Sequence, residues 1–307
     1  MNKNIIETSK LTKKFGKEKG VNNLNLRIPK GKIYGLLGRN GAGKTTTMKL
    51  LLNLIEPTEG KIFLFGEYYK NNPEKIYKNI GSIIEKPGFY SNLTAYENLK
   101  ILSTLRNNCE NEDIVNALEF VGLYEEQEKI FKNYSLGMKQ RLGIAAAIMH
   151  KPSLLILDEP INGLDPIGIH EIRKFLLKLC KEKNITIFIS SHDLSEIEQI
   201  ADIIGIMHDG VLIDEIDMNK LNEINRKYVE FNISNLKIAS EIMNQYFNKI
   251  DFTTHDENIL RIYDNFEKRG EINQQFVKKN LLVTDIFVNS ESLEEYFSKL
   301  IGEDIIA

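Results

Sequence analysis

The chain is poor in cysteine and has no long apolar run. Its two cysteines, Cys109 and Cys180, lie far apart and show no spacing typical of a metal site. This usage is typical of a protein from a reducing compartment. No stretch approaches the roughly 20 apolar residues that a membrane-spanning helix needs, and residues 1–16 lack the apolar centre of a signal peptide. We therefore expect a cytoplasmic protein that does not itself span a membrane, while a membrane-embedded partner stays compatible with these absences.

A strong net charge is also absent. Lys and Arg number 40 and Asp and Glu number 43, which gives a formal net charge of −3. This value argues against a protein that coats nucleic acid, so no nucleic-acid partner is expected. The 307 residues, 42% of them hydrophobic, suffice for about two soluble domains with substantial cores. The sequence shows no internal repeat and no low-complexity tract, so each chain carries the motifs of one nucleotide site.

What the sequence does contain is a glycine-rich turn between an apolar run and a helical pattern, in residues 32–50, KIYGLLGRNGAGKTTTMKL. It fits the phosphate-binding P-loop pattern G-x-x-x-x-G-K-[ST]. Glycines let consecutive backbone N–H groups curl around an anion, and the following helix adds the positive end of its dipole. We expect Lys44 to reach the β- and γ-phosphates and the Thr45 hydroxyl to bind Mg²⁺, so the chain binds a nucleoside triphosphate. The predicted nucleotide-binding residues of this segment are Gly38, Arg39, Asn40, Gly41, Ala42, Gly43, Lys44, Thr45 and Thr46.

The hydrophobic pattern around this turn predicts an α/β domain over residues 1–222. Short strand patterns next to the turn indicate an antiparallel layer, in which residues 23–29 are expected as one strand. Helical spacing predicts a helical part at about residues 89–150. Near-continuous apolar runs, typical of strands buried in a parallel sheet, then alternate with helical patterns. These runs are residues 153–160, 184–190 and 203–208.

The last part of the chain, residues 223–307, has a different pattern. It reads as strand, helix, strand, strand, helix and strand, with a last helix expected at residues 292–301. The order βαββαβ predicts a small ferredoxin-like α+β domain. It offers no cluster of His, Cys or carboxylate residues that would indicate a second chemistry, so a packing role is the expectation.

Two adjacent acids end the apolar run of residues 154–160, LLILDEP. At the carboxyl end of a parallel strand, Asp158 would face the P-loop and hold Mg²⁺ directly or through water. Glu159 would orient and deprotonate an attacking water. A solvated turn is the alternative for such a pair, and the P-loop upstream favours the catalytic interpretation.

Three further segments have a fixed order along the chain. They are YSLGMKQR at residues 134–141, NGLD at 162–165 and SSHD at 190–193. Together with the P-loop and the two acids, they make residues 4–220 resemble an ATP-binding subunit of an ABC transporter. The first segment resembles the ABC signature LSGGQ, except that Leu136 stands for a glycine and Met138 for the glutamine.

This resemblance implies a P-loop NTPase fold with a RecA-like core, an antiparallel β layer and a helical subdomain. In this family the signature completes the ATP site of the other subunit, so Ser135 and Gly137 would meet the γ-phosphate bound by a partner chain. One P-loop and one signature per chain imply an ATP-dependent, head-to-tail homodimer. Asp165 would touch the partner, and His192 would contact the γ-phosphate and the water. Phe15 would stack on the adenine, with an ordinary core or surface aromatic as the alternative.

One departure from the family pattern indicates a branch. The family usually has a glutamine at the end of the strand at residues 80–85, where this chain has Glu85. Glutamate at this position, the segment YSLGM and the segment SLEEYF at 292–297 resemble the bacitracin-exporter and lantibiotic-immunity branch. Glu85 would then place an acceptor-only, charged group near the Mg²⁺. The branch implies an exporter of peptide antibiotics or similar amphipathic drugs.

The function implied is ATP hydrolysis, to ADP and phosphate, coupled to transport through separately encoded transmembrane permease subunits at the inner face of the membrane. A soluble ABC-type ATPase acting on ribosomes or DNA is the alternative. Translation factors of that kind carry two cassettes, and the DNA-repair members insert a long coiled coil between P-loop and signature. Only about ninety residues separate Lys44 from Ser135 in this chain. A P-loop kinase is a third interpretation, and it leaves the signature-like segment and His192 unexplained.

Overall fold

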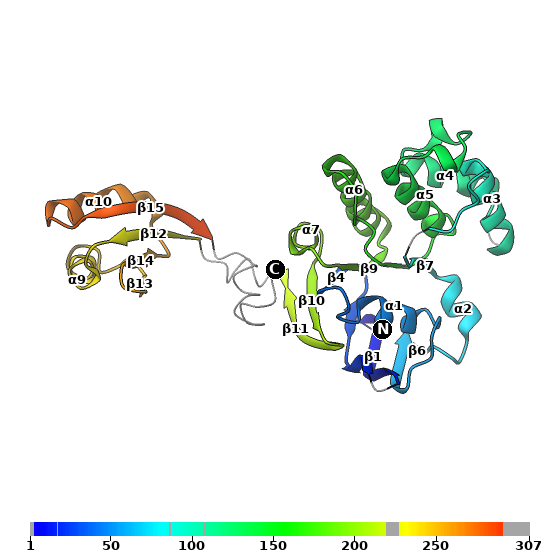
Figure 1. Ribbon diagram of the computed structural model, residues 1–307, viewed down its shortest axis with the longest axis horizontal. Coiled ribbons are helices and arrows are strands. Elements are labelled where there is room, and N and C mark those ends of the chain that lie inside the picture. Colours follow the sequence, from blue (N-terminus) through cyan, green and yellow to red (C-terminus); the bar gives the residue numbers. More distant parts are fainter. Residues whose placement is uncertain (1–2, 17, 86, 107–108, 219–226, 291–307) are drawn as a thin grey trace. The chain divides into compact units, whose positions relative to one another are not determined.

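The computed structural model describes residues 3–16, 18–85, 87–106, 109–218 and 227–290. Contacts divide the chain into two compact units, Met1–Met218 and Asn219–Ala307 (Figure 1). No helix within the described ranges is long and apolar enough to cross a membrane.

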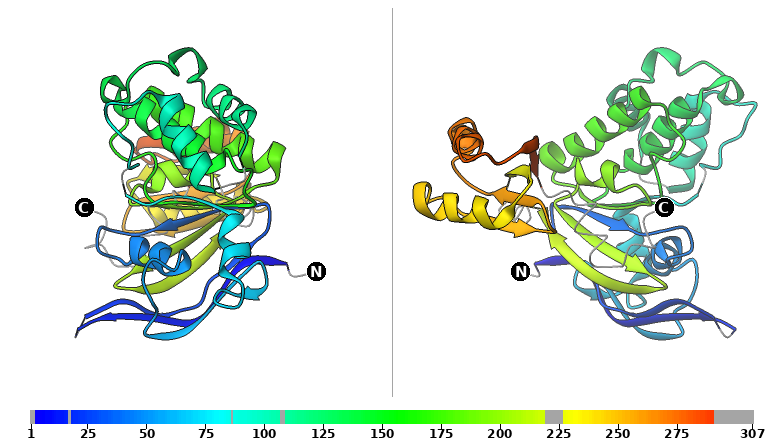
Figure 2. Two further views of the ribbon diagram at one scale, coloured as in Figure 1. Left: turned by 90° about the vertical axis from the view of Figure 1, so that its right-hand side faces the viewer. Right: turned by 60° about the vertical axis from the view of Figure 1, so that its left-hand side comes forward.

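The first unit holds two sheets and the helices that cover them (Figures 1 and 2). Its elements, in chain order, are β1 (Asn4–Phe15), β2 (Glu18–Leu24), β3 (Arg27–Pro29), β4 (Ile33–Leu37), α1 (Lys44–Leu51), β5 (Glu59–Leu64), β6 (Glu67–Tyr68), α2 (Pro73–Lys78), β7 (Ile80–Ile83), α3 (Ala95–Arg106), α4 (Asn111–Phe120), α5 (Leu136–Ile148), β8 (Leu154–Leu157), α6 (Pro166–Lys183), β9 (Thr186–Ser191), α7 (Leu194–Glu198), β10 (Ile203–His208) and β11 (Val211–Asp217).

The six-stranded sheet has the order β11-β10-β4-β9-β8-β7, and all its pairs are parallel except β10 with β11. Every residue of β4, β8 and β9 is buried, which explains their near-continuous apolar sequences. The register places Leu37 beside Ser191 and Leu157 beside Ile189. The carboxyl ends of these three strands therefore meet at one edge of the sheet.

The second sheet is antiparallel, with the order β2-β1-β5-β6 and with β3 also paired to β1. The prediction of one strand over residues 23–29 is wrong, because the chain bends between β2 and β3. Asn23 has a φ of 53°, in the left-handed region that interrupts an extended strand. The Asn25 side chain holds the bend, since its oxygen accepts from Lys10 N at 2.9 Å and its amide donates to Asn23 O at 2.9 Å.

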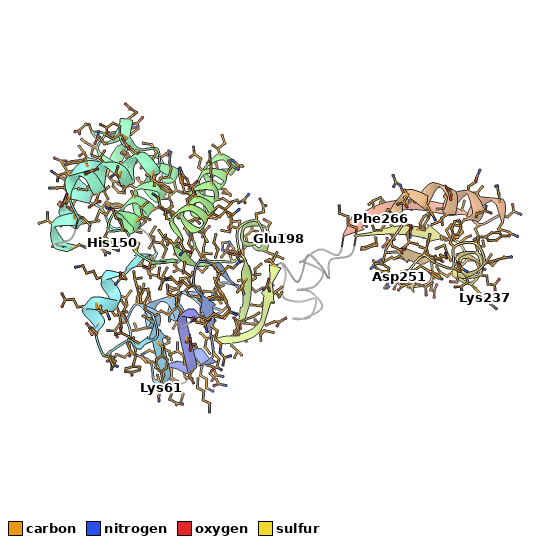
Figure 3. The ribbon with its side chains drawn as sticks, turned by 180° about the vertical axis from the view of Figure 1, so that it is seen from behind. Lys61, His150, Glu198, Lys237, Asp251 and Phe266 are labelled. Carbon is orange, nitrogen blue, oxygen red and sulfur yellow. The ribbon has the colours of Figure 1, made fainter. Side chains whose placement is uncertain are left out.

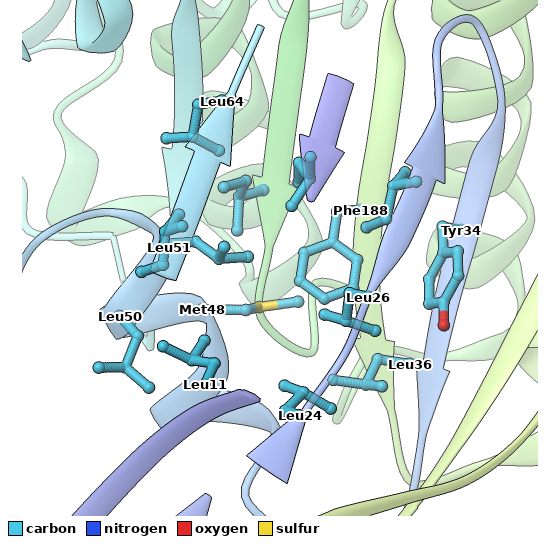
Figure 4. Packing of buried hydrophobic residues seen from close by; sticks show 14 of the residues in the cluster. Leu11, Leu24, Leu26, Tyr34, Leu36, Met48, Leu50, Leu51, Leu64 and Phe188 are labelled. Carbon is cyan, nitrogen blue, oxygen red and sulfur yellow. The ribbon is translucent and has the colours of Figure 1, made fainter. Parts of the chain in front are cut away.

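The main core brings α1 together with both sheets (Figure 4). Met48, Leu50 and Leu51 of α1 are fully buried in one cluster with residues of the antiparallel and the parallel sheet. Burial of a leucine or phenylalanine side chain contributes about 1.5–3 kcal/mol. This packing fixes the start of α1, and with it the P-loop, against the sheet. The partners labelled in Figure 4 are Leu11, Leu24, Leu26, Leu64, Tyr34, Leu36 and Phe188.

Helices α3, α4 and α5 form the helical part that the pattern predicts within residues 89–150. The end of α5 lies directly on β7, because a Cβ added at Gly81 would be only 2.0 Å from the Ala147 carbonyl oxygen. His150, which follows α5 and is labelled in Figure 3, is buried and bonds the Ile80 carbonyl through Nε2 at 3.1 Å.

The second unit has the predicted order βαββαβ. Its strands form one antiparallel sheet in the order β13-β14-β12-β15, and apolar residues of both helices join the strands in one core. This is the ferredoxin-like arrangement. The helix expected at residues 292–301 lies outside the described residues. The elements are β12 (Lys227–Ile233), α9 (Leu236–Tyr246), β13 (Phe252–His255), β14 (Ile259–Ile262), α10 (Arg269–Lys278) and β15 (Val283–Ser290).

Candidate nucleotide site

Two glycines of the P-loop are required by close contacts. The loop joins β4 to α1, and a Cβ added at Gly38 would lie 2.3 Å from the Met207 carbonyl oxygen. A Cβ at Gly43 would lie 2.4 Å from the Gly20 carbonyl oxygen, and Gly43 has a φ of 105°. Only glycine tolerates both conditions. The two fixed glycines of the sequence pattern are therefore explained by the space around the loop.

Lys44 is buried inside the P-loop, with 4% of its surface exposed. Its Nζ donates to the carbonyl oxygens of Gly38 at 2.6 Å and Arg39 at 3.1 Å. The same nitrogen lies 3.4 Å from Glu159 Oε1. A fixed ammonium group next to the N-terminus of α1 gives a local positive site that suits phosphate.

Asp158 joins the P-loop to the ends of two strands. Its Oδ2 accepts a hydrogen bond from Thr45 Oγ1 at 2.8 Å, and its Oδ1 accepts one from Ser190 Oγ at 2.7 Å. The carboxylate is buried, which makes hydrogen-bond partners for both oxygens necessary. The structure thus brings Thr45 and Asp158 together, 113 positions apart in the sequence.

Glu159 lies between a lysine and a histidine. Its Oε2 is 3.4 Å from His192 Nδ1 and accepts from Asn162 Nδ2 at 2.9 Å, while Oε1 faces Lys44. Its backbone is in the left-handed region, with a φ of 45°, and its N–H donates to Ser190 Oγ at 2.9 Å. Such a backbone costs about 1–3 kcal/mol in a residue other than glycine and is concentrated at functional sites. The Glu159 side chain is 22% exposed, and its role as the base that accepts a proton from water stays a prediction.

Phe15 ends β1 next to the P-loop helix. A Cβ added at Gly20 would lie 2.9 Å from the Phe15 ring and 3.5 Å from Thr46 Cγ2, so the ring and Thr46 flank the same glycine. The ring is 52% exposed. Lys13 Nζ lies over the ring, 5.3 Å from its centroid. A half-exposed aromatic ring beside the phosphate loop suits stacking on a base, and this role stays a prediction.

Glu85 follows β7 and pairs with a residue of α1. Its carboxylate forms an ion pair with Lys49, in the last turn of α1, at 2.7 Å, and this lysine lowers the pKa of Glu85. In the described part of the chain, no hydrogen bond or ion pair joins Glu85 to Thr45 or Asp158. Its role as a metal ligand stays a prediction.

Ser135 and Asp165 are the N-caps of α5 and α6. Ser135 Oγ accepts from Met138 N at 3.3 Å, and Asp165 Oδ1 accepts from Gly168 N at 2.9 Å. Both residues are exposed, and Gly137 follows Ser135 in the first turn of α5. Between the described residues, the hydrogen bonds of these two side chains stay within their own helices. No hydrogen bond between described residues therefore joins the side chain of Ser135 or Asp165 to the P-loop of the same chain.

Sequence reasoning gave no role to Ser190, Asn162 or Lys49. Ser190 bonds both Asp158 and the Glu159 N–H, and Asn162 fixes the Glu159 carboxylate. The sequence did contain a signal for Ser190. It is a polar residue at the end of an apolar strand, β9, and the neighbouring strand β8 ends just before Asp158. No comparable signal marked Lys49.

The chemistry of Thr45 and Asp158 fits Mg²⁺. Both offer hard oxygen donors, and nucleotide-bound Mg²⁺ is usually held by one or two protein groups together with phosphate oxygens and water. Among the residues that the structure describes, no three His, Cys, Asp or Glu side chains form a metal cluster. A metal at this edge would thus be shared between the protein and a nucleotide.

Comparison with known proteins agrees with this geometry. The model of the ABC transporter family matches residues 21–162. The bacitracin transport ATP-binding protein BcrA of Enterococcus faecalis is 59% identical over 303 residues, which cover 99% of this chain and 98% of that protein. The lantibiotic transport ATP-binding protein SrtF of Streptococcus pyogenes is 46% identical over 211 residues, which cover 69% of this chain and 90% of SrtF.

The fold has solved counterparts. A structure described as the ATP binding subunit of an ABC transporter matches with a TM-score of 0.64 at 28% identity, and the match covers 72% of this chain and 92% of that one. The first unit is therefore a P-loop NTPase cassette with an added antiparallel layer and a helical subdomain. Together with the identity over nearly the full length of BcrA, these matches show that the chain belongs to the ABC transporter family, as an ATP-binding subunit.

Proposed function

We propose that the chain is the ATP-hydrolysing subunit of an ABC exporter for peptide antibiotics of the bacitracin or lantibiotic type, or for similar amphipathic drugs. The observation that carries the enzymatic part is the cluster of Lys44, Asp158 and Glu159 at one edge of the parallel sheet. The transported class rests on the full-length likeness to a bacitracin transport protein and on the shorter likeness to a lantibiotic transport protein.

The residues of the cluster divide the work on ATP. Lys44 and the P-loop N–H groups bind the β- and γ-phosphates, and Phe15 stacks on the adenine. Thr45 and Asp158 hold Mg²⁺, which when bound neutralises charge on the phosphates. The other roles follow from the same geometry. Glu159 accepts the proton of the attacking water, and His192 beside it contacts the water and the γ-phosphate. Glu85 is a further candidate for the metal shell.

A second copy of the chain completes the site. The polar groups that the family uses across the dimer, on Ser135 and Asp165, lie on exposed helix starts rather than at the P-loop. Two apolar side chains beside them are exposed as well, Leu136 by 49% and Ile167 by 72%. Exposed apolar groups beside exposed polar ones favour a surface that a partner covers. The homodimer is head-to-tail and forms with ATP.

Separately encoded permease subunits hold the dimer at the inner face of the cell membrane. The segment from residue 87 to residue 105 transmits the opening and closing of the dimer to them. Tyr90 is 62% exposed and Leu105 is 74% exposed on this segment, which fits a contact with an apolar partner surface.

ATP hydrolysis and dimer formation test the enzymatic proposal together. We would compare wild type, Glu159→Gln and Glu56→Gln, whose carboxylate is exposed and paired only with Lys70 among the described residues, in phosphate release and in size analysis with Mg²⁺-ATP. We expect wild type and Glu56→Gln to hydrolyse ATP with specific activity that rises with protein concentration. Glu159→Gln should lose at least about 100-fold of the rate and accumulate as an ATP-bound dimer.

Two results would reverse these assignments. Normal hydrolysis by Glu159→Gln would show that another group is the base, and a chain that stays monomeric in ATP would refute the composite site.

The transport role needs a separate test. Affinity capture from membranes of the source cell should recover a polytopic membrane subunit with the wild-type chain. Expression of the pair in a sensitive cell should raise resistance to bacitracin or a lantibiotic, and Glu159→Gln should abolish the gain. Recovery of ribosomes or DNA in an ATP-dependent manner, with no membrane subunit, would instead support the soluble ATPase.

A further inference from the structure

Leu136 stands where the ABC signature has a glycine, and its side chain contacts a second segment. It is the first residue of α5 and is half-exposed. A Cβ added at Gly163 would lie 3.6 Å from Leu136 Cδ2, so this methyl group lies beside Gly163. Gly163 has a φ of 76°, a conformation that favours glycine and leaves its backbone open to the contact.

Leu164 lies in the reciprocal position, beside a glycine of the other segment. A Cβ added at Gly137 would lie 4.0 Å from Leu164 Cδ2, and one at Gly168 would lie 3.5 Å from Leu164 Cβ. The half-buried Leu164 side chain thus lies over two glycines, one at the start of α5 and one at the start of α6. Each segment therefore presents a leucine to a glycine of the other.

Polar contacts do little to join these two segments. The Ser135 and Asp165 side chains each cap their own helix. Further along, Arg141 of α5 and Glu171 of α6 form an ion pair at 3.6 Å, and the Glu171 side chain is 42% exposed. Exposed pairs of this kind contribute only about 0–1 kcal/mol. The two leucines are thus the apolar side chains that lie between the two helix starts.

We propose that Leu136 and Leu164 form an apolar clamp that fixes residues 162–165 to residues 134–137 of the same chain. Under the proposed function, on which this inference rests, both segments face the ATP of the second copy. The clamp keeps the two segments in a fixed relative position, so that Ser135 and Asp165 reach the ATP of the second copy at the same time. Leu136 is therefore a positioning residue, and the leucine that replaces the signature glycine serves to hold residues 162–165 in place.

The clamp can be measured first without ATP and without a dimer. In hydrogen exchange on the nucleotide-free chain, Leu136→Ala should speed exchange of the amides of residues 162–165, where Leu164 N donates to Ile161 O at 3.2 Å. Alanine removes the contact without the backbone entropy that glycine would add. Leu54→Ala, at a leucine that is 61% exposed outside both segments, should change nothing there. Unchanged exchange in Leu136→Ala would overturn the clamp.

The consequence for the reaction is measured in the Glu159→Gln background. Leu136→Ala and Leu164→Ala should each raise the protein concentration for half-maximal ATP-dependent dimerisation by about fivefold, the size expected for a half-buried leucine contact. The double variant should dimerise about as well as the more impaired of the two single variants, because the loss of either leucine already separates the segments. Binding of a fluorescent ATP analogue to the monomer should stay unchanged, and Leu136→Met should restore dimerisation.

The outcomes separate the inference from the proposed function. Faster exchange together with weaker, non-additive dimerisation supports the positioning role. Additive losses, weaker ATP binding by the monomer, or dimerisation equal to that of the parent would overturn it. A Glu159→Gln parent that never dimerises would refute the proposed composite site and with it the positioning role, while the exchange result would still decide whether the clamp exists.

Discussion

The P-loop side and the signature side of the proposed ATP site differ in how far one chain completes them. On the P-loop side, Thr45, Asp158, Ser190 and Glu159 are linked by hydrogen bonds between segments far apart in the sequence. On the signature side, Ser135 and its counterparts are exposed and cap their own helices. The first side is preorganised in the single chain, and the second side has its polar groups satisfied locally until a partner arrives. Changes on the first side should therefore impair the chemistry, and changes on the second should impair assembly.

Among the residues that only support the site, the largest expected effect comes from Ser190→Ala. The change removes the donor to Asp158 Oδ1 and the acceptor of the Glu159 N–H, so the Asp158 carboxylate and the Glu159 backbone each lose a hydrogen bond. Outer partners of this kind are worth about 10- to 100-fold in activity, and we expect that loss in the steady-state ATPase rate. The matched control is Ser191→Ala, because the next hydroxyl bonds Asp193 and Glu196 instead. Equal losses in the two variants would contradict a specific role of Ser190.

Ser135→Ala should have a smaller effect, and on a different quantity. It removes an N-cap, which costs about 1 kcal/mol of the free energy of unfolding. Asn235→Ala removes an equivalent cap from α9 in the second unit, where Asn235 Oδ1 accepts from Ile238 N at 3.2 Å. Both variants should lose similar stability in urea denaturation. Only Ser135→Ala should weaken ATP-dependent dimerisation of the Glu159→Gln protein, by about tenfold for a lost hydrogen bond to a charged group.

The control gives this prediction its meaning. If Asn235→Ala weakens dimerisation as much as Ser135→Ala, the loss reflects general destabilisation. In that case the Ser135 hydroxyl has no place in the site of the second copy.

Much of the fold was predictable because its signals are local. The glycine spacing of the P-loop, the buried runs that became β8 and β9, and the order βαββαβ all lie within short stretches of sequence. The break between β2 and β3 was not predictable in the same way. It depends on the positive φ of Asn23 and on the Asn25 side chain, which bonds from the connection between β2 and β3 to Lys10 of β1.

The site divides along the same line. Lys44, Thr45, Asp158, Glu159 and His192 were predicted from motifs, and the structure brings them together at one edge of the sheet. The supports of these residues depend on how strands align in space, which a motif does not encode.

Glu85 shows that a position in a motif does not predict every contact of its side chain. The family position gave it a metal role, and its carboxylate pairs with Lys49 on α1. That pairing depends on how the end of α1 lies against the chain that follows β7, and no spacing in the sequence indicates it.

The smallest effect is expected from the titration of His150, which should leave the activity at neutral pH unchanged. This prediction still sharpens the comparison, because His150 lies beyond the other end of α5, the helix that begins in the signature-like segment. The start of α5 is exposed, whereas His150 beyond its end is buried against β7. Burial, with a smaller contribution from the Arg106 charge, lowers the pKa of His150 to about 4 from 6.5. The neutral ring donates from Nε2 to the Ile80 carbonyl oxygen. Its buried Nδ1 has no hydrogen-bond partner in the described structure, so protonation there is unfavourable.

The sign of the pH dependence follows from that lowered pKa. The unfolded chain takes up a proton at His150 below about pH 6.5 and the folded chain does so only near pH 4, so stability falls as the pH falls between these values. We expect His150 alone to lower the free energy of unfolding by about 2 kcal/mol between pH 7 and pH 5. Urea denaturation of wild type and His150→Asn at both pH values isolates this contribution, because Glu215, whose pKa burial raises, acts in the opposite direction in both proteins. The same pH dependence in wild type and His150→Asn would show that His150 does not cause the loss of stability at low pH.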